Sequence, residues 1–417
     1  MARVMGERRT ADFGPRADGA GPREREGLPA WRLLRRVALC LVFLALLDAA
    51  VVRTVPPSGA FERDYRLPPG GEIGSLPAYA DHIERMRADG ATPTVVFIGA
   101  SPTWGHGIRD AADTFPYAFE RAARREGTPG AKAYNVSGDG WLPADEGYVL
   151  ARLAGAGDAF VVQLTYHTFS PAAREPSPIR EPGLPEALGV PVTSADAAAL
   201  GLRPTPGIDL GAALRSWMRR RWALYRERDL IVRRVLGDGP ERRLFRAWES
   251  ARGAQTQGSV ASQDGVAAFD SLPPARQMVV VARYARRSSF RARPGDVEVV
   301  SLRRMADLLR RHDKRAVFFV SPMNEDVIAA YKLIGPGRYA ANLDVIRAAV
   351  GPDFPVLDYH DRPFLTSEDF SDISHTTAEG GRLTGERLWR DAGAYLLGRA
   401  PASTVTAGPA PGAGVSP

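Results

Sequence analysis

The sequence TVVFIGASPTWG, residues 94–105, starts with a short apolar run and turns polar at Ser101. An apolar run of this length that ends in small and polar residues is typical of a strand buried on both faces of a parallel sheet. Four further runs have the same character, and we expect each to form such a strand. They cover residues 132–136, 159–165, 316–320 and 355–358.

Helical patterns separate most of these runs, at residues 114–125, 145–153, 296–311, 339–350 and 380–397. Strands that alternate with helices build parallel sheets. We therefore predict an α/β fold with a flavodoxin-like, doubly wound parallel sheet of five strands. The alternation stops at the proline-rich residues 171–295, where we expect a large and mostly helical insertion.

The remaining boundaries follow from composition. Residues 1–30 and 401–417 lack hydrophobic periodicity and are rich in Gly, Pro or small residues, so we expect both ends to be disordered. The other predicted parts are a transmembrane signal-anchor at 31–53, a linker with a leading helix at 54–91, and the α/β domain at 92–400.

An apolar segment near the N-terminus predicts the location of the protein. Sixteen residues from Val37 to Val52 are interrupted by a single charge, Asp48. Leu33 and Leu34 extend this run towards the length that crosses a bilayer. Nine arginines and five acidic residues precede Val37, so the positive-inside rule predicts a single-pass inner-membrane protein whose main domain faces the periplasm or the outside. The alternative is a cleaved signal peptide. A cut after Ala50 or Ala49 would place Asp48 or Leu47 at the third residue before the cut, where signal peptidases require a small residue.

The charge balance is basic, and the basic residues are mostly arginine. The 417 residues carry 55 Lys and Arg against 48 Asp and Glu, a formal net charge of +7, and all but three of the basic residues are arginines. This excess is weak evidence for nucleic acid, which we do not expect as a partner. The arginine-rich residues 214–236 fit an amphipathic helix packed on its own domain, or one that contacts an anionic lipid or polymer. Cys40 is the single cysteine, which excludes an intrachain disulfide and a cysteine-based zinc site.

Two polar segments, far apart in the chain, carry residues suited to nucleophilic catalysis. Ser101 follows the first predicted strand, at the sheet edge where ligands of open α/β sheets bind. Asp372 and His375 are three residues apart, so the carboxylate can fix the imidazole tautomer that accepts a proton from a serine. Each segment also has a simpler reading, in which Ser101 or Asp372 caps the next helix.

Together these segments resemble the SGNH, or GDSL-like, hydrolase and O-acyltransferase superfamily, in its membrane-anchored bacterial cell-envelope form. Gly99-Ala100-Ser101 stands where that family has Gly-Asp-Ser, and Asp372-Ile373-Ser374-His375 matches its last block. The resemblance implies a Ser101, His375, Asp372 triad. It also implies that Gly138 donates its backbone N–H to the oxyanion. His167 stands in place of the family's asparagine, and a neutral imidazole can supply the missing donor.

Weaker signals complete the set of candidate residues. Asn324 follows the fourth predicted strand, so we place it at the ligand-binding edge, where it contacts substrate or caps a turn. We read His106, five residues after Ser101, as pocket wall or core. His360-Asp361 lacks further metal ligands, and we expect neither a metal nor a cofactor.

These observations predict an outward-facing serine esterase or O-acyltransferase. By resemblance, its substrate is an acylated, most simply acetylated, cell-envelope glycan or a small acyl ester, and a multi-span membrane O-acyltransferase is a candidate partner. The replacement of the family asparagine by His167 supports a second reading, an SGNH-fold binding or assembly protein with impaired catalysis. A third, an intracellular arginine-rich nucleic-acid binder, requires Val37–Val52 to be a core helix.

Overall fold

The structure is a computed structural model that describes residues 30–54, 61, 65–67, 75–90, 93–204, 211, 214, 217–218, 222–226, 267–360 and 364–405. Its chain contacts divide into two units, Met1–Ala50 and Val51–Pro417. The apolar N-terminal segment forms one helix, α1 (Ala30–Thr54). Within the described residues, no helix combines the length and hydropathy needed to cross a membrane. The membrane-spanning role of this segment stays a prediction.

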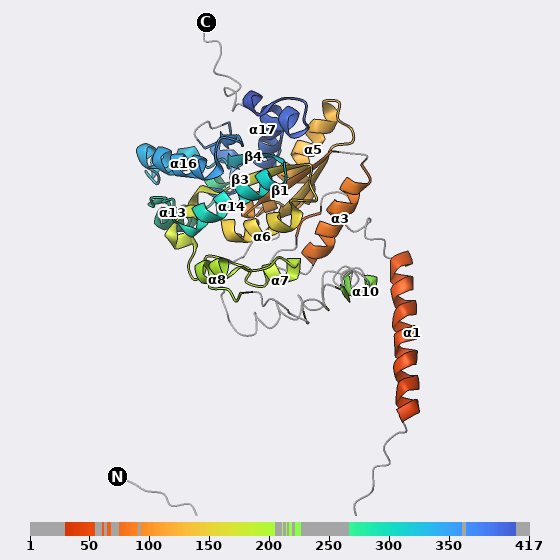
Figure 1. Ribbon diagram of the computed structural model, residues 1–417. Coiled ribbons are helices and arrows are strands. Elements are labelled where there is room, and N and C mark those ends of the chain that lie inside the picture. The colour runs from red at the N-terminus through yellow and green to blue at the C-terminus, as the bar shows by residue number, and fades with distance from the viewer. Residues whose placement is uncertain are drawn as a thin grey trace, which may run out of the picture. The chain divides into compact units, whose positions relative to one another are not determined.

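The second unit is built on one parallel sheet, as predicted (Figure 1). The strand order β2-β1-β3-β4-β5 is the order of doubly wound sheets of the flavodoxin type. Every neighbouring pair is parallel, so all strands end at the same edge. The strands are β1 (Thr94–Gly99), β2 (Lys132–Ser137), β3 (Ala159–Leu164), β4 (Arg315–Val320) and β5 (Val356–Asp358).

Helices cover both faces of the sheet because alternate strand residues are apolar on each side. Val95, Phe97 and Phe319 pack with α5 (Phe115–Arg125) and α17 (Ala378–Leu396) in one core cluster. The other cluster joins the opposite strand face to the remaining main helices (Figure 1). These are α3 (Leu76–Ala88), α6 (Pro143–Leu153), α14 (Val297–Arg311) and α16 (Pro336–Val350). Burial on both faces explains the uninterrupted apolar runs in the sequence.

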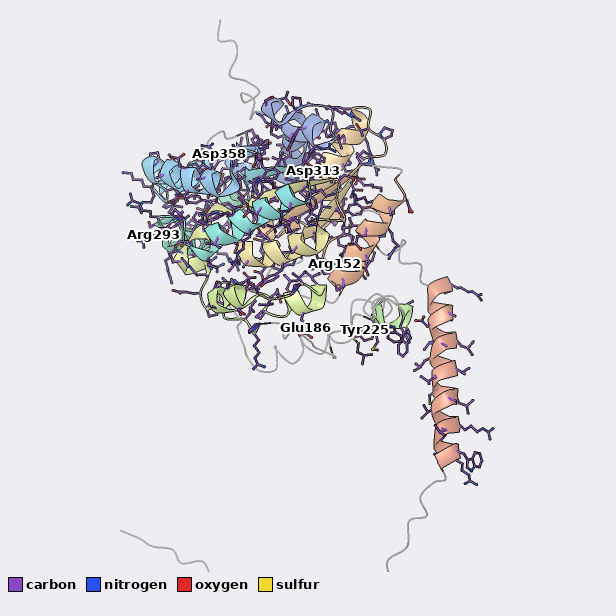
Figure 2. All side chains as sticks on the ribbon, viewed as in Figure 1. Arg152, Glu186, Tyr225, Arg293, Asp313 and Asp358 are labelled. Atoms are coloured by element: carbon purple, nitrogen blue, oxygen red, sulfur yellow. The ribbon has the colours of Figure 1, made fainter. Side chains whose placement is uncertain are left out.

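Ion pairs and apolar contacts tie the peripheral elements to this core. Arg152 on α6, labelled in Figure 2, forms ion pairs with Asp81 and Glu84 on α3. At the other end of the chain, a turn at Ala402–Thr404 places Ala402 and Val405 against the core cluster of α5 and α17. Residues 406–417 lie outside the described residues, as do residues 1–29.

Where it is described, the insertion at 171–295 combines short helices with turns and irregular loops. Its helices are α7 (Leu184–Leu188), α8 (Ser194–Leu200), α10 (Ala223–Arg226) and α13 (Pro274–Ser288). The arginine-rich segment 214–236 is described at 214, 217–218 and 222–226, where Leu214 and Trp217 are exposed. Its predicted amphipathic face therefore falls mostly outside the described residues.

Candidate active site

Ser101 is held at the junction between β1 and the short helix α4 (Ser101–Trp104). Gly99 allows this tight turn, because a Cβ there would lie 2.8 Å from Gln163 Cβ and would also collide with Thr103. Ser101 is 9% exposed. As the first residue of a helix, it has no intrahelical acceptor for its N–H. The serine therefore presents a hydroxyl and a backbone donor at the carboxyl edge of the sheet.

The structure brings Ser101, His375 and Asp372 together in one hydrogen-bonded chain. His375 Nε2 lies 2.8 Å from Ser101 Oγ, and His375 Nδ1 lies 2.6 Å from Asp372 Oδ2. The second oxygen of Asp372 accepts the backbone N–H groups of Ser374 and His375 at 2.7 and 2.8 Å. Because Asp372 accepts at Nδ1, the tautomer with Nε2 free to accept the serine proton is favoured.

The electrostatics keep Asp372 ionised. Burial by itself would raise the pKa of this carboxyl. The charge of His375 and the hydrogen bonds from His375 and Ser374 outweigh burial, and they hold the pKa of Asp372 well below its usual value. A carboxylate that stays charged can stabilise the imidazolium formed when His375 accepts a proton.

Asn324 holds the loop that carries Asp372 and His375, and its side chain is not free to bind a ligand. Its backbone N–H donates to the Ile373 carbonyl at 2.9 Å, and its side-chain amide donates to Ser367 Oγ at 3.0 Å. Its side-chain oxygen caps α15 (Glu325–Ala330) by accepting from Val327 N–H. Asn324 is 1% exposed. The structure therefore confirms the capping alternative for Asn324 and corrects the predicted substrate contact, since both ends of the side chain are occupied within the protein.

His167 lies close enough to the triad to be affected by its charges. Burial, followed by the charge of His375, lowers the pKa of His167 to about 3. Its Nδ1 is buried without a hydrogen-bond partner, and its ring packs edge-on against Tyr284 with centroids 5.2 Å apart. The imidazole is therefore neutral at physiological pH. This is the state in which one ring nitrogen donates a hydrogen bond without adding a charge.

The backbone N–H of Gly138 is already used. It donates to the Gly99 carbonyl at 3.3 Å, which extends the pairing of β1 and β2 by one bond. A Cβ at Gly138 would collide with the indole ring of Trp141, so this position needs glycine for packing. In this conformation the Gly138 N–H is not available to an oxyanion, which corrects its predicted role and leaves the Ser101 N–H as a candidate backbone donor.

The structure adds a second Asp–His pair that the sequence reading missed. His106 Nδ1 lies 3.2 and 3.3 Å from the two oxygens of Asp139. The rings of His106 and His375 lie against each other at a tilt, with centroids 4.6 Å apart and planes inclined by 37°. A signal existed in the sequence, because Asp139 directly follows the Gly138 block and His106 follows Ser101 by five residues.

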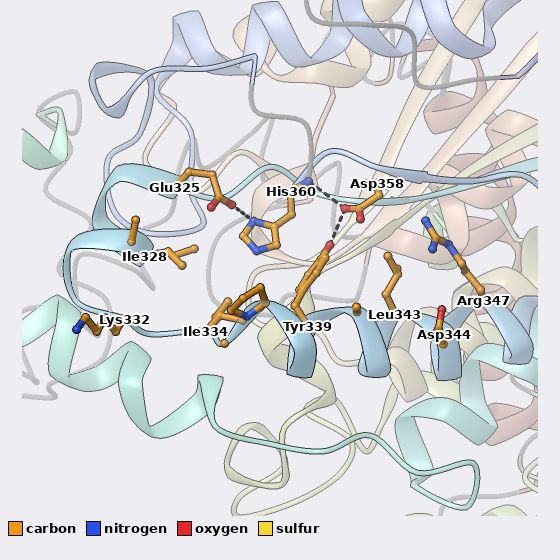
Figure 3. A pocket seen from close by; sticks show the side chains of 14 residues that line it. Glu325, Ile328, Lys332, Ile334, Tyr339, Leu343, Asp344, Arg347, Asp358 and His360 are labelled. Carbon is orange, nitrogen blue, oxygen red and sulfur yellow. Dashed lines mark hydrogen bonds and ion pairs between the residues drawn. The ribbon is translucent and has the colours of Figure 1, made fainter.

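A separate cavity of about 730 Å³ opens beside β5 and α16 (Figure 3). Glu325 forms an ion pair with His360, and the Tyr339 hydroxyl donates to Asp358 at 2.5 Å. Ser101 is not among the residues that line this cavity. Throughout the described ranges, no group of three or more His, Cys, Asp or Glu side chains is arranged to hold a metal ion.

Two buried histidines predict a loss of stability in mild acid. Burial lowers the pKa of His82 to about 4 and that of His167 to about 3, whereas both titrate near 6.5 when unfolded. Below pH 6.5 these two histidines bind more protons in the unfolded chain than in the folded one, so their contribution to the free energy of unfolding decreases as the pH falls from 6.5 towards 4. Thermal unfolding between pH 8 and 4.5 measures this decrease.

The replacement His82→Phe should flatten that dependence, and an unchanged slope would contradict the assignment. Asp372 adds no pH dependence within this window, because its lowered pKa keeps its stabilising contribution constant until the pH falls below its ordinary value of 3.8. His106 has the opposite effect on stability to His82 and His167. Its hydrogen bond to Asp139 raises its pKa, so its stabilising contribution to the free energy of unfolding is complete below pH 6.5 and is lost at higher pH.

Comparisons with known proteins add little to this geometry. The sequence matches no described protein family and no curated protein. Among solved structures, the chain is similar to a carbohydrate acetylesterase family member from Sinorhizobium meliloti, with 14% identity and a TM-score of 0.35 over 74% of this chain and 100% of that one. A similarity at this level carries no conclusion about activity, which therefore depends on the site itself.

Proposed function

We propose that the protein is a serine-dependent acyl-ester enzyme. The observation that carries this proposal is the unbroken chain from Ser101 Oγ through His375 to Asp372, with distances of 2.8 and 2.6 Å. A serine hydroxyl is a weak nucleophile until an adjacent base removes its proton. His375 is in position to do so, and Asp372 holds it in the required tautomer.

The mechanism proceeds in two steps. His375 Nε2 takes the proton of Ser101 as Oγ attacks the ester carbonyl, and the same proton then passes to the leaving alcohol. The Ser101 N–H and His167 stabilise the oxyanion of the tetrahedral intermediate. Water, or a second alcohol, then attacks the acyl-serine while His375 takes its proton. The bond between the acyl carbon and Ser101 Oγ breaks, and His375 returns the proton to Oγ. Water gives hydrolysis and an alcohol gives acyl transfer, so the acceptor that the site admits decides between them.

The substrate class and location are further parts of this proposal. We propose an acylated cell-envelope glycan, most simply an acetylated one, because the sequence resembles enzymes that act on such polymers. The apolar run from Val37 to Val52, preceded by nine arginines, supports a single-pass anchor that keeps the α/β domain outside the cytoplasm. A multi-span O-acyltransferase in the same membrane would be a fitting partner for acyl transfer.

One observation favours a second function, a binding or assembly protein with impaired catalysis. The Gly138 N–H is engaged by Gly99, and His167 replaces an amide, so two of the oxyanion donors implied by the resemblance are altered. Loss of one such donor costs about two to three orders of magnitude in kcat. The two functions differ in whether Ser101 is activated, which a covalent probe reports.

We expect a fluorophosphonate probe to label the full-length protein at Ser101. The probe reacts with serines whose proton is removed by a neighbouring base, so Ser101→Ala should abolish the adduct that peptide mass analysis detects. Ser321→Ala is the matched control. Ser321 lies buried at the same sheet edge, but Gln163 rather than an imidazole binds its hydroxyl, at 3.0 Å. A folded wild-type protein that stays unlabelled would favour the binding function.

A further inference from the structure

The site contains two Asp–His pairs whose rings lie against each other. His375 is bonded to Asp372, and His106 is bonded to Asp139. The two ring centroids are 4.6 Å apart. Proton transfer from Ser101 places a positive charge on His375, so this charge develops in direct contact with the second imidazole.

The fold ties the second pair to the nucleophile. The backbone N–H of His106 donates to the Ser101 carbonyl at 3.0 Å, through a turn in which Gly105 has a φ of +84°. Asp139 follows Gly138 at the end of β2, the strand beside β1. The second pair is therefore positioned by the same strand ends that position Ser101.

The charges around His106 come from several elements. Asp139 acts on it from the turn after β2, Asp372 from the loop before α17, and Arg66 from the segment before α3. The ring of His375, on the same loop as Asp372, lies against it. The hydrogen bond that His106 donates to Asp139 raises the pKa of His106 and outweighs burial and Arg66, which lower it. The side chains of His106 and Asp139 are 28% and 29% exposed, so solvent screens these charges in part.

We propose that His106 and Asp139 are a positioning pair that sets the basicity of His375. When His106 is protonated, its positive charge lies beside the ring of His375 and makes His375 a weaker base. When His106 is neutral, the negative charge of Asp139 stays nearby and makes His375 a stronger base. The effect on turnover rests on the proposed function, but the coupling between the two imidazoles does not.

The coupling predicts shifts of opposite sign for two single variants. His106→Gln removes the adjacent positive charge and leaves the Asp139 carboxylate, so the pKa of His375 should rise. Asp139→Asn removes a negative charge that interacts with His375, so the pKa of His375 should fall. A unit charge at this distance in partly solvated surroundings shifts a pKa by roughly one unit.

The test is a proton titration of the full chain labelled with carbon-13 at histidine Cε1, followed by NMR. The sequence contains six histidines, so single replacements assign the resonances. Opposite shifts of the His375 titration in His106→Gln and Asp139→Asn support the inference. An unchanged His375 titration in both variants, or shifts of the same sign, overturns it. The double variant His106→Gln/Asp139→Asn carries neither charge and should lie between the two.

Activity gives a second readout that separates the two proposals. If Ser101 is the nucleophile, the acid limb of the kcat/KM profile for an aryl acetate should move to higher pH in His106→Gln and to lower pH in Asp139→Asn. A purely structural role would lower the rate in both variants without displacing the limb in opposite directions. Opposite NMR shifts in a protein without esterase activity would keep this inference and refute the proposed function.

Discussion

Replacement of Ser101 by alanine should reduce the rate of aryl acetate hydrolysis by about three to six orders of magnitude, to the level left by binding and the remaining oxyanion donors. The variant lacks the oxygen that forms the acyl-enzyme, and His375 keeps its bond to Asp372 but has no hydroxyl to deprotonate. Removing this single hydroxyl should leave the fold intact, because serine and alanine differ by one atom and the backbone of the turn is unchanged. The measurement is the initial rate of phenol release by the purified full-length protein.

Ser321→Ala is again the control for this experiment. It removes a hydroxyl from the same sheet edge and disturbs Gln163, which also accepts a hydrogen bond from the Ala100 N–H. Activity of the same order as wild type in Ser321→Ala, combined with its loss in Ser101→Ala, locates the nucleophile. Equal rates in wild type and Ser101→Ala would assign the observed hydrolysis to another group.

The strands of the sheet could be predicted from the sequence because each strand is buried on both faces. A strand of this kind needs apolar side chains on both sides, as in the continuous runs Val95–Ile98 and Ala316–Val320, and such runs predicted the strand bounds to within about one residue. The triad was readable for a local reason. Asp372 and His375 lie within one turn of chain, and Ser101 directly follows a strand, so topology alone brings them to one edge.

The corrections concern contacts that depend on register and tertiary packing. Whether the Gly138 N–H is free depends on how β1 and β2 align. Gly99 pairs with Ser137, so the N–H of the following residue, Gly138, donates to the Gly99 carbonyl. The role of Asn324 depends on Ser367, which is 43 residues away. No local pattern specifies either contact.

The pair of His106 and Asp139 was missed for the same reason. The two residues are 33 positions apart, and each lies in a loop that has no periodicity of its own. Their neighbouring strands could have suggested the contact, since β1 and β2 end side by side. The arginine-rich segment 214–236 stays a prediction, because most of it lies outside the described residues.

Asp372→Asn should reduce kcat by about three to four orders of magnitude while the protein stays folded. The carboxylate accepts the Nδ1–H of His375, which leaves Nε2 unprotonated towards Ser101. An asparagine amide donates to Nδ1 instead and favours the tautomer with the proton on Nε2. That imidazole cannot accept the proton of Ser101. The variant also lacks the negative charge that stabilises the imidazolium of His375 as Ser101 attacks.

The matched control is Asp369→Asn, which makes the same chemical change on the same loop. Asp369 accepts hydrogen bonds from the N–H and the hydroxyl of Thr366, at 2.8 and 3.1 Å. An asparagine oxygen can still accept both, so this variant should keep a rate close to that of wild type. Rates and thermal unfolding midpoints are compared for both variants. If Asp372→Asn retained the rate of Asp369→Asn, another group would be setting the tautomer of His375, and Asp372 would serve only to order the loop through the backbone N–H groups of Ser374 and His375.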